Sequence, residues 1–286
     1  MAIGAFNKLN VDPEDIRRID GIHIAQNIHA RLITLPRPTR FLAAVLVGSD
    51  PAAMSFLKKK ANIAKELGVD FRLFRFPETV SSEELRHEVA RIATYEACGG
   101  IVVQLPLPDH IDKRSVMNDL PPEKDVDVLG ERAALAARKG KQSVVPPPVG
   151  VIEVLLTETG FVLETARVAI IGLGFLVGKP VTAWMEGRVK ELHALDTESD
   201  LSTIADADLV VSGTGSAGLL KPGALKSGAG VIDFGYAHVN GRLVGDLDAS
   251  LPKDLERLSF YTPTPGGTGP ILVAKLFENF FVLNQK

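Results

Sequence analysis

The chain is poor in the residues that cross-link proteins or hold metals. Cys98 is its only cysteine, which excludes an internal disulfide and a cysteine-rich metal site. The six histidines are scattered, at positions 23, 29, 87, 110, 193 and 238, and none forms the spaced pair of a zinc-binding helix. We therefore predict a protein that needs no metal.

The sequence also lacks a strong charge of one sign and a long apolar run. Its 32 basic and 35 acidic residues give a net charge of −3, so nucleic acid is not an expected partner. It contains no apolar stretch of roughly 18 residues, so we expect no membrane span. The N-terminus lacks the apolar run of a signal peptide, which indicates a cytoplasmic protein. A Gly-x-Ser-x-Gly motif is missing too, which removes support for a serine hydrolase.

Strand and helix patterns alternate through the first half of the chain. An apolar run at 40–47 predicts a buried strand, and Asp50 and Pro51 after it have the types that begin a helix. We expect this helix to end at Gly68, a strand at 70–76, a capping box at 81–84, a helix to about Cys98 and a strand at 99–104. Alternation of this kind predicts parallel sheets with covered faces.

The alternation resumes after the stiff segment Pro146–Pro148. The second half predicts a helix at 149–159, strands at 168–171, 190–195, 208–212 and 230–233, and a C-terminal helix after 262–270. A length of 286 residues suits two domains at roughly 100–200 residues each. We predict an α/β protein of two lobes. Residues 1–144, joined by the C-terminal helix 264–286, form a parallel-sheet substrate domain, and residues 145–263 form a Rossmann-like dinucleotide-binding domain.

A glycine-rich turn follows the apolar segment that begins at Val168. Gly172 and Gly174 remove Cβ atoms that would keep a pyrophosphate away from the backbone, and the helix after the turn offers free N–H groups. Gly178 allows the helix to pack closely on the strand. The spacing is one residue longer than the usual fingerprint, and glycines also form plain turns. The strand before it and the helix after it favour dinucleotide binding.

Several polar positions could serve a catalytic site, although each has a plainer explanation. Phe56 and Lys60 lie four residues apart on one helix face, but Lys60 also ends a lysine run typical of a solvated surface. Gln104 closes an apolar strand, where parallel sheets bind ligands, or is simply a polar strand end. Asp125 and Asp127 are a pair of carboxylates or two turn formers.

Eight short segments, in order, resemble the bifunctional methylenetetrahydrofolate dehydrogenase/cyclohydrolase family. The resemblance extends from about Val45 to the C-terminal helix. The segments are 47–52 with Lys60, 104–108, 122–127, 177–180, 221–223, 231–235, 244–246 and 262–270.

The resemblance implies roles for the matching residues. Lys60 would be the catalytic lysine, Gln104 would position it, and Asp127 would bind the pterin ring. Phe56 stands where the family has a tyrosine that stacks on folate. The turn Pro265, Gly266 and Gly267 would lie near the nicotinamide and the substrate. The family also implies a homodimer formed through the dinucleotide lobe, and tetrahydrofolate one-carbon derivatives as substrates.

Departures from the family pattern surround the folate site. Ala53 and Met54 replace Ser-Gln, and Phe56 lacks the tyrosine hydroxyl. Val128 replaces a glycine, and a β-branched residue tolerates positive φ poorly. The segment Pro146–Gly150 is one residue shorter than expected. These changes bear more on hydrolysis than on dehydrogenation.

The dinucleotide loop departs as well, in a way that bears on the choice of cofactor. Leu173 and Gly174 occupy positions where the family carries an arginine or serine able to hold a 2′-phosphate. Asp196 follows the next predicted strand, 24 residues after Gly172. An acidic residue roughly 20 residues on is the one that binds the ribose hydroxyls of NAD. An ordinary loop residue is the alternative for Asp196. We expect NAD or NADP as cofactor, with a preference for NAD, and no metal. The predicted cofactor-binding residues are Gly172, Leu173, Gly174, Val177, Gly178, Asp196, Thr214 and Gly215.

The leading hypothesis is oxidation of 5,10-methylenetetrahydrofolate to the methenyl form and hydrolysis of that form to 10-formyltetrahydrofolate. Three alternatives remain at this point. The first is an NAD-dependent dehydrogenase without hydrolysis, and the second a folate- or nucleotide-binding protein without turnover. The third is another two-lobed dehydrogenase that resembles shikimate or amino-acid dehydrogenases.

Overall fold

The computed structural model describes residues 18–196 and 199–285 and divides the chain into two compact units. Among the described residues, one unit comprises 21–154, 174–184 and 269–285 and holds a three-stranded sheet. The other comprises 18–20, 155–173, 185–196 and 199–268 and holds a five-stranded sheet. We call them the three-stranded and the five-stranded unit and describe each by itself.

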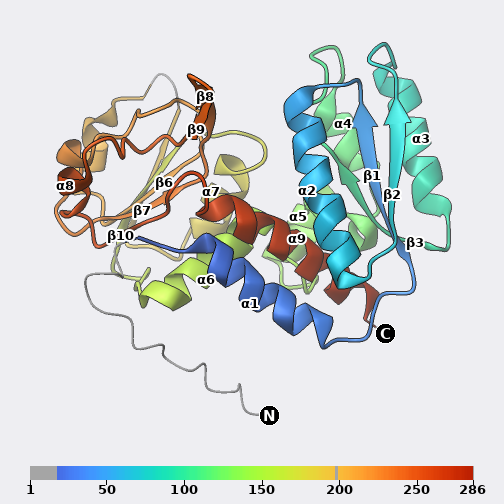
Figure 1. The fold of residues 1–286 in the computed structure, drawn as a ribbon, viewed down its shortest axis with the longest axis horizontal. Helices are drawn as coiled ribbons and strands as arrows, with labels where there is room; N and C mark the ends of the chain where they lie inside the picture. Colours follow the sequence, from blue (N-terminus) through green and yellow to red (C-terminus); the bar gives the residue numbers. More distant parts are fainter. Residues whose placement is uncertain (1–17, 197–198, 286) are drawn as a thin grey trace. The chain divides into compact units, whose positions relative to one another are not determined.

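The three-stranded unit is built on the parallel sheet β2-β1-β3. Its strands are β1 (Phe41–Val47), β2 (Phe71–Phe76) and β3 (Cys98–Val103), and every residue of β1 and β3 is buried. Alternate β1 residues pack on opposite faces. One set meets α3 (Ser82–Thr94) and α4 (Lys113–Asn118), and the other meets α2 (Pro51–Leu67). Figure 1 shows α2 and α3 on the two sides of the sheet. Helices on both faces confirm the predicted covered parallel sheet.

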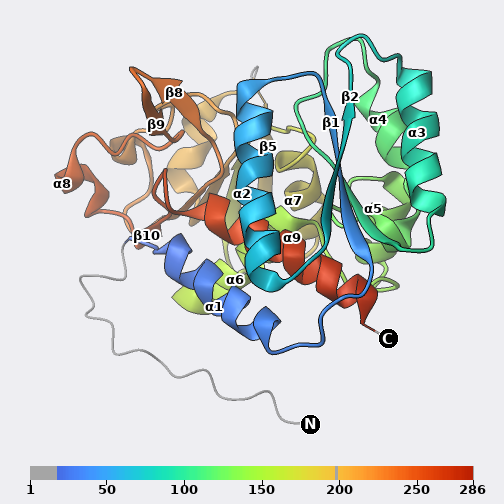
Figure 2. The ribbon, with the colours of Figure 1, turned by 45° about the vertical axis from the view of Figure 1, so that its right-hand side comes forward.

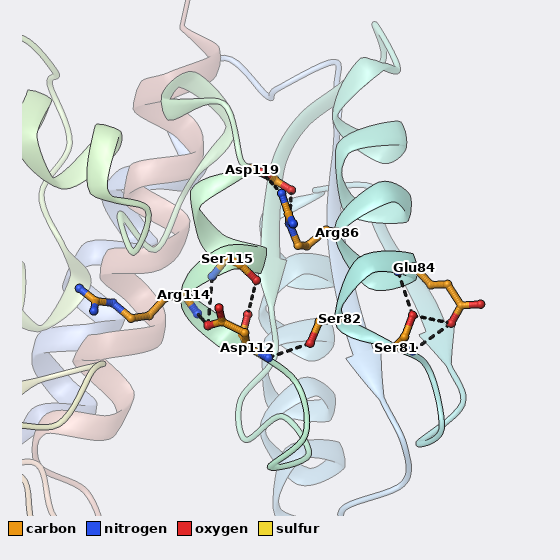
Figure 3. Close-up of polar contacts among 8 residues, drawn as sticks. All are labelled: Ser81, Ser82, Glu84, Arg86, Asp112, Arg114, Ser115 and Asp119. Carbon is orange, nitrogen blue, oxygen red and sulfur yellow. Dashed lines mark hydrogen bonds and ion pairs between the residues drawn. The ribbon is translucent and has the colours of Figure 1, made fainter.

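Local capping fixes where the helices of this unit begin and end. The Asp50 carboxylate accepts the Ala53 N–H at 2.7 Å, and Gly68 ends α2 with a φ of +69°. The capping box is present at α3, where Ser81 and Glu84 satisfy each other's backbone N–H groups (Figure 3). Prediction of a helix to about Cys98 was wrong. The helix α3 ends at Thr94, and Cys98 is already the first residue of β3.

The remaining elements of this unit join segments from distant parts of the chain. They are α1 (Gly21–Ile33), η1 (Pro122–Lys124), α5 (Glu131–Arg138), the first part of α6 (Pro147–Thr159), most of α7 (Gly178–Met185) and α9 (Thr268–Asn284). Buried Asn279 of α9 donates to the carbonyls of Val126 and Val145 at 2.9 and 2.8 Å. Asn284 donates to the Gly99 carbonyl at 3.0 Å. Figure 3 also shows the ion pair that joins Arg86 of α3 to Asp119 after α4.

The five-stranded unit holds the parallel sheet β10-β7-β6-β4-β5. Its elements in chain order are β4 (Arg167–Ile171), β5 (Glu191–Leu195), η2 (Leu201–Asp206), β6 (Leu209–Ser212), η3 (Pro222–Ala224), β7 (Gly230–Asp233), α8 (Pro252–Leu255) and β10 (Phe260–Tyr261). One face is covered by a cluster that includes Ile171, Ile204, Val210, Val231 and Leu258. The two parallel sheets confirm the predicted α/β class.

A small antiparallel hairpin stands apart from the parallel sheet of this unit. Its strands are β8 (Ala237–Val239) and β9 (Arg242–Val244), labelled in Figure 2. Asn240 and Gly241 link them with φ values of +51° and +75°, the pattern of a tight primed turn.

No helix within 18–196 or 199–285 is long and apolar enough to cross a membrane.

Candidate active site

The order of the three-stranded sheet creates a natural binding edge at the carboxyl ends of β1 and β3. After β1 the chain adds β2 on one side of this strand and later adds β3 on the other side. The strand order therefore reverses between β1 and β3, which makes this a topological switch point. Gln104 directly follows β3, and its backbone N–H donates to the Val45 carbonyl of β1 at 2.9 Å. Gln104 therefore lies at this switch point, as the sequence predicts for a ligand-binding group.

Lys60 and Gln104 meet at the switch point. The Lys60 ammonium nitrogen donates to the Gln104 side-chain oxygen at 2.9 Å. The amide nitrogen of Gln104 donates in turn to the Leu105 carbonyl at 2.6 Å, which leaves the oxygen turned toward Lys60. The Gln104 side chain is 5% exposed, so its amide has few alternative orientations. The pair predicted from the resemblance is thus brought together by α2 and the end of β3.

Burial distinguishes Lys60 from the other members of its lysine run. Lys58 and Lys59 are exposed, whereas Lys60 is partly buried. Burial lowers the pKa of Lys60 from its usual range, and the negative charge of Asp127 partly opposes the shift. A solvated surface therefore describes the first two lysines but not Lys60. A lysine with a lowered pKa can exchange protons at a more neutral pH.

The two carboxylates of the Asp125–Asp127 segment occupy different environments. Asp125 forms an isolated parallel bridge with Ile101 of β3, so the segment extends along the sheet edge. Burial raises the pKa of Asp127, and the charge of Lys60 opposes this rise. Asp125 is 1% exposed, and one of its oxygens accepts the Gly130 N–H at 2.8 Å. Asp127 therefore interacts electrostatically with Lys60, while Asp125 organises the backbone that follows.

Val128 has the unusual backbone conformation that its replacement of a glycine implies. Its φ is +55°, in the left-handed region that costs a β-branched residue energy. The side chain is 1% exposed and packs with Ala133 and Val144. Phe56 lies one turn before Lys60 on α2 and is partly buried, with the Lys59 ammonium 5.5 Å from its ring centroid. Phe56 keeps an aromatic face beside the lysine but has no hydroxyl.

The five-stranded sheet has its own switch point, between β4 and β6, and predicted cofactor residues lie there. Gly172 follows β4 with a φ of +86°, and its N–H donates to the Leu195 carbonyl of β5 at 2.9 Å. A Cβ at Gly172 would lie 2.9 Å from the Thr214 methyl group and 3.0 Å from Gly213. Gly172 and Thr214 are therefore in contact where the strand order of this sheet reverses. Such a switch point is the usual place for a nucleotide.

The rest of the predicted glycine turn leads into α7. The Lys179 N–H donates to the Gly174 carbonyl, and the Val181 N–H to the Val177 carbonyl, both at 3.0 Å. Gly178 is the first residue of the helix. A Cβ at Gly174 would meet no atom within 4 Å, so the backbone there is open. The division between the two units falls between Leu173 and Gly174.

Asp196 lies exposed at the carboxyl end of β5, beside β4. The Ser199 hydroxyl donates to the Asp196 carboxylate at 2.9 Å and accepts the Asp196 N–H at 3.0 Å. Because the Gly172 N–H is bonded to Leu195, the residue before Asp196, the two predicted cofactor residues lie on neighbouring strand ends.

The loop after β6 rests on a carboxylate that the predicted set omits. The Thr214 N–H donates to Asp246 at 2.8 Å, and Gly215 has a φ of +71°. Asp246 is fully buried, and Asp233 at the end of β7 is 1% exposed. Both belong to the Val231–Gly235 and Val244–Asp246 segments that carry the resemblance, which is the signal that could have identified them.

The turn Pro265–Gly267 also lies in the five-stranded unit. The Thr264–Pro265 peptide is cis, and Gly266 has a φ of +97°. A Cβ at Gly267 would lie 2.4 Å from the Pro263 carbonyl, so the turn itself requires a glycine there.

Among the residues with described positions, no three acidic, cysteine or histidine residues gather as a metal site would require.

Two family models together match most of the chain. The tetrahydrofolate dehydrogenase/cyclohydrolase catalytic domain matches residues 18–127, and the NAD(P)-binding domain of the same proteins matches residues 146–286. The chain belongs to the tetrahydrofolate dehydrogenase/cyclohydrolase family. This confirms the predicted family and sets aside the alternative of another two-lobed dehydrogenase.

Members of this family resemble the chain over most of their length. The bifunctional protein FolD of Aquifex aeolicus is 35% identical over 243 residues, which are 83% of this chain and 82% of that protein. The crystal structure of bifunctional FolD from Campylobacter jejuni has a TM-score of 0.84 at 30% identity, and covers 92% of this chain and 96% of its own. The Trypanosoma brucei FolD structure, complexed with NADP and an inhibitor, has a TM-score of 0.83 at 30% identity, with coverage of 93% and 96%.

Proposed function

We propose that the Lys60–Gln104–Asp127 group carries the folate chemistry of this family member. The protein is a methylenetetrahydrofolate dehydrogenase/cyclohydrolase of one-carbon metabolism. It oxidises 5,10-methylenetetrahydrofolate with NAD(P) and hydrolyses the methenyl product to 10-formyltetrahydrofolate. The hydrogen bond between Lys60 and Gln104 is the observation that supports this assignment most directly.

The residues of the β4–β6 switch point fit a dinucleotide. The positive φ of Gly172 and the open space beside Gly174 suit a backbone that approaches a pyrophosphate closely. Gly172, Leu173, Gly174, Val177 and Gly178 would hold the pyrophosphate side of the cofactor, and Asp196, Thr214 and Gly215 its nucleoside portions. Bound NAD(P) supplies the hydride acceptor.

Oxidation asks these side chains for positioning rather than for proton transfer. The methylene carbon lies between two nitrogens whose lone pairs expel the hydride, and a delocalised methenyl cation results. Asp127 accepts N–H groups of the pterin ring, since a carboxylate accepts two donors side by side. Phe56 supplies a flat apolar face for the folate. Alignment of the reacting atoms is then the main contribution of the protein.

Hydrolysis requires the lysine. Water adds to the methenyl carbon, and Lys60 accepts the proton that the water loses as the C–O bond forms. Lys60 then returns that proton to N5 as the C–N5 bond breaks. The remaining hydroxyl proton leaves to solvent as the C=O bond forms, so the ring opens and the formyl group stays on N10. A lysine with a lowered pKa, held by Gln104, is suited to accept and return a proton near neutral pH.

We infer a preference for NAD over NADP from Asp196. Its exposed carboxylate at the end of β5 would accept ribose hydroxyl groups and repel a 2′-phosphate. Leu173, in the turn after β4, offers no positive charge to such a phosphate.

A spectrophotometric assay tests the proposed function. Purified protein would be supplied with 5,10-methylenetetrahydrofolate and either NAD or NADP, while reduced cofactor and acid-stabilised methenyl product are followed. Hydrolysis of added methenyltetrahydrofolate would be measured on the same preparation. Turnover in both assays supports the proposal. Oxidation without hydrolysis would identify a dehydrogenase alone, and cofactor and folate binding without turnover would favour a binding protein.

The homodimer, the cytoplasmic location and the domain bounds at residues 144 and 263 stay predictions. The dimer rests on the resemblance alone. Gel filtration with light scattering would measure the oligomeric state.

A further inference from the structure

Two buried carboxylates of the five-stranded unit, Asp233 and Asp246, lie close enough to interact electrostatically, and Asp246 contacts the loop after β6. Asp246 accepts the Ser212 hydroxyl at 2.6 Å and the Thr214 N–H at 2.8 Å, both on Oδ2. Asp233 accepts the Gly235 N–H on Oδ1 at 2.8 Å and the Leu247 N–H on Oδ2 at 2.9 Å. These contacts join the loops that follow β6, β7 and β9.

Two glycines allow the carboxylates to approach these loops so closely. A Cβ at Gly235 would lie 2.1 Å from the Asp246 carboxyl carbon. A Cβ at Gly245 would lie 2.1 Å from Asp233 Oδ2. Any side chain at either position would displace a carboxylate. The backbone is therefore shaped around the pair.

Burial of these two carboxylates costs folding free energy that an apolar contact in the same place would avoid. Within the described part of the chain, neither carboxylate forms an ion pair with a cation, and Asp246 Oδ1 is buried without a hydrogen-bond partner. Burial, with the nearby charge of Asp246, raises the pKa of Asp233 to about 7. Buried acidic groups without a cation are expensive, and apolar residues would fill the same space at lower cost.

The Asp246 carboxylate is bonded to the loop that borders the β4–β6 switch point. Asp246 Oδ2 fixes the N–H of Thr214, whose methyl group borders Gly172 at the switch point. Thr214 in turn accepts the Ser216 N–H on its hydroxyl at 3.1 Å, and so shapes the loop around Gly215. We propose that Asp246, backed by Asp233, is a positioning residue that holds the 213–216 loop in the shape that binds the dinucleotide. This inference rests on the proposed placement of the cofactor at Thr214 and Gly215.

The two reactions of the protein separate a positioning role from a general loss of structure. Hydrolysis of methenyltetrahydrofolate uses no dinucleotide, whereas oxidation does. Asp246→Ala removes the acceptor of the Thr214 N–H, so the dissociation constants of NADH and NADPH should rise at least about tenfold. The kcat of hydrolysis should stay within about twofold of wild type. Asp246→Asn keeps an oxygen acceptor and places an amide donor at the Oδ1 side, so it should restore cofactor binding to within about threefold.

Ser212→Ala is a milder second variant, in case Asp246→Ala does not fold. It removes one donor to Asp246 Oδ2 and should raise the same constants a few-fold, with hydrolysis unchanged. Equal losses in cofactor binding and hydrolysis, or unchanged cofactor binding in a folded Asp246→Ala protein, would overturn the proposal.

Gly215→Ala separates the inference from the placement on which it rests. A Cβ at this positive φ strains the loop directly. If Gly215→Ala weakens cofactor binding and Asp246→Ala does not, the positioning role is wrong. If neither changes it, the placement of the dinucleotide on this loop is itself wrong.

Discussion

The Lys60 ammonium is bonded to the Gln104 side-chain oxygen at 2.9 Å, although the two residues are 44 positions apart. The Gln104 amide nitrogen is occupied by the next carbonyl in the chain, that of Leu105. The oxygen therefore has one orientation, and the lysine has a fixed partner that carries no charge. An uncharged acceptor leaves the lowered pKa of Lys60 in place, which an acidic partner would not do.

Replacement of Lys60 by methionine should abolish hydrolysis while leaving the fold intact. Methionine keeps the apolar stem and removes the group proposed to carry protons, so the rate of hydrolysis should fall about 100-fold or more. Hydrolysis of methenyltetrahydrofolate measures it, and Lys58→Met on the exposed neighbouring position is the matched control. Normal hydrolysis by the Lys60 variant would show that the lysine has another role.

Gln104→Glu should move the pH profile of hydrolysis upward. A carboxylate beside Lys60 favours its charged form and raises its pKa. The neutral lysine that accepts a proton would then become abundant only at higher pH. Rates from pH 6 to pH 10 measure the shift. A profile that coincides with that of the wild type would mean that Lys60 does not act as the base.

Asp125→Asn should flatten the dependence of stability on pH. Burial raises the pKa of Asp125 to about 7, so the folded protein holds a proton that the unfolded chain has released above about pH 4. The stabilising contribution is complete below that pH and is lost as the pH rises through 7. A shift of this size is worth a few kcal/mol. Urea unfolding from pH 4 to pH 8 measures it, and a variant as pH-sensitive as the wild type would contradict it. Exposed Asp109→Asn is the control.

Asp196→Ala should shift cofactor preference toward NADP. If Asp196 has the proposed role, removal of its carboxylate removes both the acceptor for ribose hydroxyls and the repulsion of a 2′-phosphate. We expect the ratio of kcat/KM for NADP over NAD to rise about tenfold or more, which corresponds to about 1.4 kcal/mol. Asp206→Ala, which removes an exposed charge elsewhere in this unit, should leave the ratio unchanged.

Val128 offers a test of backbone strain. At an ordinary buried position, glycine is worse than alanine by about 0.5–1 kcal/mol. At φ +55° the order should reverse or vanish, because glycine relieves strain of about 1–2 kcal/mol. Urea unfolding of Val128→Ala and Val128→Gly would be compared with the same two changes at Val144, a buried residue of the same cluster. The usual alanine–glycine difference at Val128 would argue against strain.

The sequence predicted the elements whose signals are local. Asp50, Pro51, Gly68 and the Ser81–Glu84 box all lie where they were expected, because a cap depends on residues within one helical turn. The end of α3 was harder, since neither glycine nor proline directly follows Thr94, and the helix ends there with Tyr95 in an extended conformation. The Asn240–Gly241 dipeptide is in itself a strong local signal for a hairpin turn.

The site divides in the same way. Gln104 could be predicted because a polar residue at the end of a buried strand is conspicuous. The burial of Lys60 could not, since its two lysine neighbours gave it the pattern of a surface, and only the fold places it against Gln104. Asp233 and Asp246 were missed because their importance depends on two loops meeting across the sheet end.

The bonds from α9 impose an order of events during synthesis. Asn279 and Asn284 satisfy carbonyls beside Asp127 and at the start of β3, yet they are made after more than 100 intervening residues. The three-stranded unit, which holds Lys60, is therefore begun early in synthesis and completed late, after the last strand of the five-stranded unit has emerged. A nascent chain that stops before α9 would expose the apolar surface against which that helix packs. We expect such a chain to be bound by chaperones or degraded by proteases rather than to act as a partial enzyme.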